Sequence, residues 1–76
     1  MATFTVRQGK RYRATITLSG IERWASNDMI ASRLRDAGFS EVQVSGLGTT
    51  RVAEALWPGA DTTAEMPAQV TEVLEV

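Results

Sequence analysis

The fold is decided by a segment in which apolar and polar residues alternate, Arg11-Tyr12-Arg13-Ala14-Thr15-Ile16-Thr17-Leu18. Successive side chains of a β-strand point to opposite faces, so the even-numbered apolar residues share one face and the arginines and threonines share the other. This pattern predicts a strand with one buried and one solvent-facing side. Upstream, Phe4 and Val6 alternate in the same way, and residues 8–10 fit a turn or a bulge. Residues 3–18 therefore form either a hairpin or one long bent strand.

The segment after this strand predicts two helical pieces. Residues 19–22 have the Ser-x-x-Glu pattern of a capping box, which marks the start of a helix. A single helix from there to residue 38 would place Ile21 and Trp24 nearly opposite Ile30 and Leu34, whereas one amphipathic helix carries one apolar stripe. We therefore expect a short turn around residues 20–25, followed by a separate helix.

That helix is expected to run from about Asn27 to Ala37. Ser26 or Asn27 would cap it, and Gly38 would end it. The apolar face of the preceding turn then points away from the helix stripe. A second surface must cover it, either the chain's own C-terminus or another molecule.

The second half of the chain is rich in short strand patterns. Residues 41–45 predict a strand with Val42 and Val44 inward, residues 46–49 a hairpin connection, and residues 50–57 a third strand. The inward face of this third strand carries either Val52 and Leu56 or the smaller surface of Ala53, Ala55 and Trp57. We choose Val52 and Leu56, on the condition that Glu54 lies near the sheet rim. Residues 61–66 predict a short helical turn capped by Asp61 or Thr62. Residues 67–76 fit a strand or a helix, and their valine content favours the strand.

The resulting order is strand, helix, strand, strand, short helix, strand. It predicts a single α+β domain over residues 1–76. The expected architecture is a small two-layer split β-α-β domain of the ferredoxin-like kind, with one main helix packed on an antiparallel sheet of roughly three to five strands.

The helix exit carries a family resemblance. Residues 30–39, Ile-Ala-Ser-Arg-Leu-Arg-Asp-Ala-Gly-Phe, form a helix that ends in a glycine and an aromatic residue before a strand. This segment resembles the small peptidoglycan-binding domains of bacterial division and sporulation proteins, which share the split β-α-β order. The rest of the chain departs from that pattern, since it predicts no second full-length helix and no membrane anchor. The resemblance assigns no binding residue.

Composition narrows the classes of function. The chain has 76 residues, 43% of them hydrophobic and 22% charged, which is typical of a globular domain rather than a disordered one. It has no cysteine and no histidine, so disulfides are excluded and a zinc site has almost no ligands. With no thiol, no imidazole and one lysine, we expect no enzymatic activity, no metal and no cofactor. No apolar run suits a membrane helix or a signal peptide, which predicts a cytoplasmic location.

Charge is divided between the two halves of the chain. Residues 1–38 carry seven basic and three acidic side chains, or +4, whereas residues 39–76 carry one basic and six acidic side chains, or −5. The basic residues cluster near the N-terminus, at Arg7, Lys10, Arg11 and Arg13. Such a cluster can bind phosphate, an acidic partner, or the acidic half of its own fold or of a second copy.

Three function hypotheses follow. A core of this size supplies only ~3–5 kcal/mol, and without a disulfide or a metal the chain depends on tight packing or on association. We therefore expect a non-enzymatic protein-interaction or assembly module that self-associates, with Trp24, Trp57, Arg11 and Arg13 as interface candidates. The two arginines would lie opposite acids of a second copy, such as Glu72 and Glu75.

The alternative is a small nucleic-acid-binding domain that uses the basic strand, with Arg7, Lys10, Arg11 and Arg13 on phosphates. Strand parity weakens it, because Tyr12 points toward the core and cannot stack on a base. A third hypothesis, a small-ligand or glycan binder, has no specific residues to support it.

Overall fold

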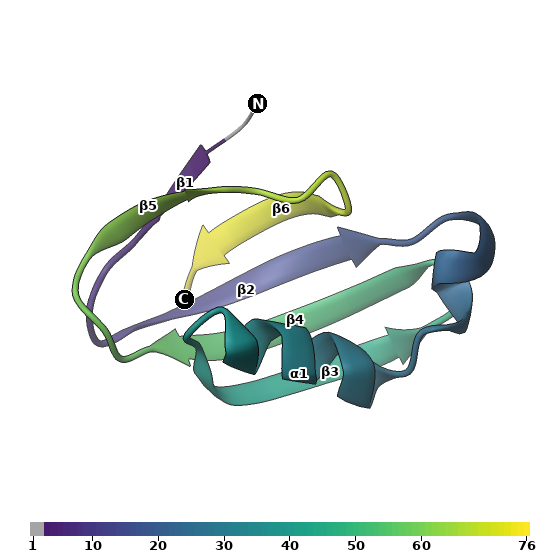
Figure 1. Cartoon of the computed structure of the whole chain (residues 1–76), viewed down its shortest axis with the longest axis horizontal. Helices are drawn as coiled ribbons and strands as arrows, with labels where there is room; N and C mark the ends of the chain where they lie inside the picture. The colour runs from purple at the N-terminus through teal and green to yellow at the C-terminus, as the bar shows by residue number, and fades with distance from the viewer. Residues whose placement is uncertain (1–2) are drawn as a thin grey trace.

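A four-stranded antiparallel sheet forms one layer of the molecule (Figure 1). The computed structural model describes residues 3–76. The sheet has the order β3-β4-β2-β6, built from β2 (Lys10–Thr17), β3 (Ser40–Leu47), β4 (Thr50–Trp57) and β6 (Val70–Glu75). Two short strands, β1 (Thr3–Val6) and β5 (Thr62–Glu65), pair with one another in a separate antiparallel ribbon.

The helical segments connect β2 to β3, as the sequence predicts. A short 3-10 helix, η1 (Gly20–Trp24), precedes α1 (Asn27–Asp36). Ser26 caps α1, because its hydroxyl accepts a hydrogen bond from the Met29 amide at 3.1 Å. Gly38 ends the helix with a φ of 114°, and a Cβ at this position would lie 3.0 Å from the Trp57 ring. Glycine therefore allows both the chain reversal and the close approach of the ring.

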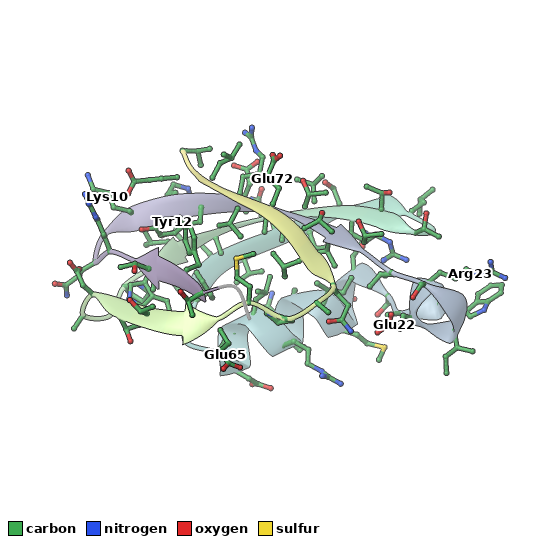
Figure 2. All side chains as sticks on the ribbon, turned by 90° about the horizontal axis from the view of Figure 1, so that it is seen from above. Lys10, Tyr12, Glu22, Arg23, Glu65 and Glu72 are labelled. Atoms are coloured by element: carbon green, nitrogen blue, oxygen red, sulfur yellow. The ribbon has the colours of Figure 1, made fainter. Side chains whose placement is uncertain are left out.

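The second layer consists of α1 and the β1–β5 ribbon, which lie on the same side of the sheet (Figures 1 and 2). Its packing against the sheet centres on Ile16, Leu18 and Ala53, with Leu34 of α1 and Val44 of β3 among the partly buried neighbours. The predicted parity of residues 11–18 is confirmed, since Tyr12 and Ile16 are buried while Arg13 and Thr17 are exposed.

The predicted buried face of β4 is wrong. Ala53 and Ala55 are buried, whereas Val52 and Leu56 lie on the opposite, half-buried side. The two-residue turn between β3 and β4 fixes the register that pairs Val44 with Ala53, so an inward Val44 requires an inward Ala53. Side-chain size alone, on which the prediction rested, did not include this constraint.

The predicted helical turn at residues 61–66 is also wrong, because these residues form β5 and pair with β1. The Asp61 side chain does not cap a helix; its carboxylate accepts a hydrogen bond from the Gln8 amide at 2.7 Å and thereby joins the two turns that lead into the ribbon. Residues 3–18 form two strands on either side of a turn, and β1 pairs with β5 and not with β2. The strand expected near the C-terminus is confirmed as β6.

The residues that the structure describes form a small α+β domain with one α-helix and six strands in two antiparallel sheets. Its radius of gyration is 11.8 Å. Within residues 3–76, neither helical segment has the length and apolar character needed to cross a lipid bilayer.

Candidate interaction surface and apolar cavity

Four large apolar side chains are exposed where η1, the start of α1 and the β3–β4 hairpin meet. We call Ile21, Trp24, Met29 and Leu47 the end patch; their exposed fractions are 86%, 77%, 57% and 89%. η1 projects at one extremity of the molecule, where Figure 2 labels Arg23. Scattered exposed apolar residues are ordinary, but a cluster of large ones is typical of a binding surface.

A buried arginine holds the three elements of the end patch together. Arg51, the first inward residue of β4, is 5% exposed. Its Nη2 donates to the Arg23 carbonyl at 3.0 Å, its Nη1 to Asn27 Oδ1 at 2.8 Å, and its Nε to the Gly48 carbonyl at 3.2 Å. One guanidinium therefore ties η1, α1 and the hairpin to one another.

Asn27 extends this network. Its Nδ2 donates to the Gly46 carbonyl at 3.2 Å while its oxygen accepts from Arg51. Among the described residues, the ion pairs within 4.0 Å do not include Arg51, so its charge is balanced by neutral acceptors. Buried cations are usually paired with a carboxylate, and this exception fixes geometry at some cost in stability.

The η1 turn is fixed from the other side by Glu22. Its carboxylate accepts from Gln69 Nε2 at 2.7 Å and from the Ser19 amide at 3.3 Å. These hydrogen bonds, first that from Gln69 and then that from the Ser19 backbone, lower the pKa of Glu22 below its ordinary value. The Arg23 guanidinium carbon lies 5.5 Å from the centre of the Trp24 ring, within cation–π range.

The two tryptophans occupy different environments. Trp24 is exposed, whereas Trp57 is half-buried, lies edge-on to Phe39 at 5.0 Å between ring centres, and donates from Nε1 to the Ala60 carbonyl at 2.8 Å. Trp57 is the last residue of β4, and Arg51, which lies beside the end patch, is the second, so the strand separates the tryptophans by roughly 20 Å. They do not form one surface.

Arg11 and Arg13 lie on the face of the sheet that α1 and the ribbon leave uncovered. Arg11 pairs with Glu41 of β3 at 3.2 Å, and Arg13 with Glu54 of β4 at 3.6 Å. Glu41 has a φ of 50° at an irregularity in the β3–β4 pairing. The two arginines therefore meet acids of their own chain.

The acids proposed for contact with a second copy lie on β6. Glu72 stands opposite Thr15 in the pairing with β2, and Glu75 opposite Tyr12. Neither forms an ion pair with Arg11 or Arg13 of its own chain.

The residues of the nucleic-acid alternative differ in their partners. Arg7 and Lys10 are exposed where the β1–β2 turn meets β2, whereas Arg11 and Arg13 are ion-paired with acids of their own chain. Tyr12 is 5% exposed, and its hydroxyl accepts a hydrogen bond from the Arg7 amide at 2.6 Å. The arrangement lacks the exposed aromatic ring beside free cations that single-stranded nucleic acid uses.

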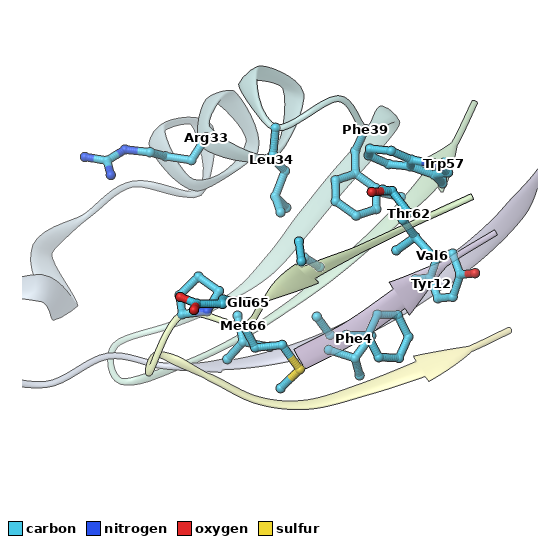
Figure 3. Close-up of a pocket in the computed structure, with 18 residues that line it drawn as sticks. Phe4, Val6, Tyr12, Arg33, Leu34, Phe39, Trp57, Thr62, Glu65 and Met66 are labelled. Carbon is cyan, nitrogen blue, oxygen red and sulfur yellow. The ribbon is translucent and has the colours of Figure 1, made fainter. Parts of the chain in front are cut away.

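An apolar cavity of about 330 Å³ lies between the two layers (Figure 3). Sequence reasoning missed it and missed the burial of Arg51. The sequence feature that indicates the cavity is the number of alanines at inward positions. Alanine side chains leave space between the layers that larger side chains would fill. The side chains around it come from α1, the ribbon and the sheet: Phe4, Val6, Tyr12, Ala14, Arg33, Leu34, Ala37, Phe39, Ala53, Ala55, Trp57, Thr62, Ala64, Glu65, Met66, Pro67, Val70 and Val73.

Metal-binding chemistry has no visible site in residues 3–76, since no three acidic residues there are grouped closely enough to hold an ion. Comparisons with known proteins give no relative: no family model, no curated protein and no solved structure matches the chain.

Proposed function

We propose that this chain is a non-enzymatic protein-interaction module that self-associates through the end patch. The observation that carries the proposal is the exposure of four large apolar side chains at one place, with Trp24 among them. Tryptophan is enriched at the energetic centres of protein interfaces, where a rigid ring gains much contact area at little entropic cost.

The hydrogen bonds that hold the end patch in place support the proposed self-association. Arg51 and Asn27 fix the backbone that carries Trp24 and Leu47, so little of that backbone has to become ordered when a partner binds. A preorganised surface loses less entropy on association than a loose one.

Charges beside the end patch suit a second copy. Arg23 and Asp28 are both exposed and flank Trp24 and Met29 along the chain. A two-fold contact apposes the same surface on both partners, so Arg23 of one copy can face Asp28 of the other. A stable dimer of ordinary size buries about 800 Å² on each partner. Four side chains supply less than that, so we expect weak, concentration-dependent association.

The four-stranded sheet and α1 also support a proposed fold likeness. We infer a split β-α-β arrangement of the ferredoxin-like kind, because β4 lies between β2 and β3 while α1 crosses from β2 to β3, and β6 pairs with the free edge of β2. The ribbon strand β5 stands where a second helix would be expected. This fold likeness does not indicate a particular function, since proteins with such folds have many unrelated functions.

Size-exclusion chromatography with light scattering tests the proposal. We expect the mass of the wild-type chain to rise with concentration from the 8.3 kDa monomer toward the dimer. Trp24→Ser should weaken association about 10- to 30-fold, the effect of removing a central interface tryptophan. Leu74→Ser is the matched control, because Leu74 is exposed on β6 outside the end patch.

Two results would contradict the proposal. One is a wild-type chain that stays monomeric at every concentration, and the other is an equal loss for Trp24→Ser and Leu74→Ser. A peak rich in absorbance at 260 nm that disappears in high salt would favour the nucleic-acid alternative instead.

A further inference from the structure

The apolar cavity lies between α1, the β1–β5 ribbon and the inner face of the sheet. Leu34 of α1 forms one wall, Phe4 of the ribbon and Met66 beside it form a second, and the inner face of the sheet forms the floor (Figure 3). Phe4 packs edge-on against Tyr12 at 5.3 Å between ring centres, which supports the ribbon over the floor. The space remains because the floor and the ribbon carry alanines at Ala53, Ala55 and Ala64 where larger residues would close it.

The interior has no polar group in need of a partner. The Tyr12 hydroxyl already accepts from the Arg7 amide, and the Trp57 indole donates away from the cavity to the Ala60 carbonyl. Among the described residues, no buried side-chain nitrogen or oxygen lacks a hydrogen-bond partner. A water molecule in such a site finds too few partners to be held, whereas apolar cavities of this kind accept apolar molecules.

The rim favours neither sign of charge. Arg33 and Glu65 are the charged residues among those that line the cavity, and both are exposed. Figure 3 shows Arg33 extending away from the cavity, on the far side from the aromatic cluster of Phe39 and Trp57. A rim with one basic and one acidic group does not favour a ligand that carries a charge of either sign.

We propose that the cavity binds a single uncharged alkyl chain of about ten carbons. A methylene group takes up about the same space as a water molecule, ~30 Å³, so a 330 Å³ cavity holds roughly ten of them. This assignment is independent of the end patch. Each added methylene improves affinity by about fourfold until the cavity is full, because burying it removes apolar surface from water.

The two tryptophans make the test direct. Trp57 lines the cavity, and Trp24 lies at the distant end patch. The Trp24→Phe variant therefore has its single tryptophan in the cavity wall, and Trp57→Phe has it outside. The probe is ω-bromodecanol, an uncharged chain whose bromine quenches tryptophan fluorescence only at short range. Measurements are made at protein concentrations where light scattering shows a monomer.

We expect saturable quenching of Trp57 in the Trp24→Phe variant and none of Trp24 in the Trp57→Phe variant. Adding Ala64→Leu to the Trp24→Phe variant should fill the cavity and weaken binding at least tenfold. Ala68→Leu, an exposed alanine outside the lining, is the matched control in the same background. Ala14→Leu provides a second filled cavity if Ala64→Leu fails to fold by circular dichroism. Shortening the probe by two carbons should weaken binding about 15-fold.

Four outcomes would overturn the assignment. The first is an absence of saturable quenching of Trp57. The second is equal quenching of Trp24, which would indicate that the probe binds to any apolar surface. Quenching of Trp57 that is unchanged by both leucine substitutions would place the probe elsewhere. Binding that weakens as protein concentration rises would show that a second copy, rather than a small molecule, occupies the cavity.

Discussion

Arg51 is the residue on which the end patch depends. Its guanidinium is buried without a carboxylate among the described ion pairs, and it donates to two backbone carbonyls and one side-chain amide. A buried donor of this kind contributes little net stability while it is satisfied. Its removal is costly, because its acceptors are left without partners.

Replacing Arg51 with methionine should lower the free energy of unfolding by about 2 kcal/mol, since the acceptors in η1 and the hairpin lose their donor. Urea denaturation measures the change. Arg35→Met is the control, because Arg35 is exposed on α1. Equal stability of the Arg51 variant and the wild-type chain would show that the guanidinium does not hold these elements together.

Glu22 makes η1 sensitive to acid. The pKa of Glu22 is lowered by hydrogen bonds from Gln69 and Ser19, so the carboxylate stabilises the fold at a pH above its ordinary, unfolded-state pKa. That contribution is lost as the pH falls through the lower folded-state pKa.

Gln69→Ala should therefore raise the pKa of Glu22 toward its ordinary value, which carbon NMR titration of the carboxyl group measures. Gln43→Ala should leave it unchanged, because Gln43 lies on β3 away from η1. A Glu22 pKa that is the same in the wild-type and Gln69→Ala chains would exclude the contact with Gln69 as the main cause.

The β1–β5 ribbon is the least supported element. Each of its strands pairs only with the other, and every residue of β5 is exposed. Strands β2 and β4, by contrast, each have a partner on both edges. Segments with few buried contacts open locally at a fraction of the global cost.

Backbone amides of β1 and β5 should exchange with solvent at least about 100-fold faster than those of β2, as measured by NMR hydrogen exchange under native conditions. Phe4→Ala should accelerate exchange in the ribbon further and leave the β3–β4 hairpin unchanged, because the Phe4 ring packs on Tyr12. Uniform protection across both sheets would contradict a separate ribbon.

Local patterns predicted the elements that depend on local chemistry. The alternation of residues 11–18 and the Ser26 and Gly38 boundaries of α1 lie in single stretches of chain, and both are confirmed. The inward face of β4 and the strand at β5 depend on partners distant in sequence, through the hairpin register and the pairing with β1. No local pattern contains that information.

The same limit applies to the candidate site. The apolar residues of segment 20–25 do not share a face with the apolar stripe of α1, which predicted a surface that another element or molecule has to cover. Trp24 is indeed exposed on η1. Trp57 has the same side chain but lies against Phe39. Only the three-dimensional arrangement distinguishes the two.

At the scale of the whole molecule, the two ends of β4 differ in character. One end carries the end patch and the buried Arg51, and the other carries Trp57 beside the apolar cavity. The separation of charge along the sequence is partly neutralised within the fold, where Arg11 and Arg13 meet Glu41 and Glu54. Association is therefore expected to depend on the apolar end patch more than on these arginines.

The most direct test of this claim is the fluorescence of Trp24 in the Trp57→Phe variant, followed with acrylamide quenching as protein concentration rises. We expect a fully accessible indole in dilute solution, and a blue-shifted, protected one at high concentration. Leu47→Ser should remove that protection, because Leu47 belongs to the same patch. An indole that stays equally accessible at every concentration would contradict self-association through the end patch.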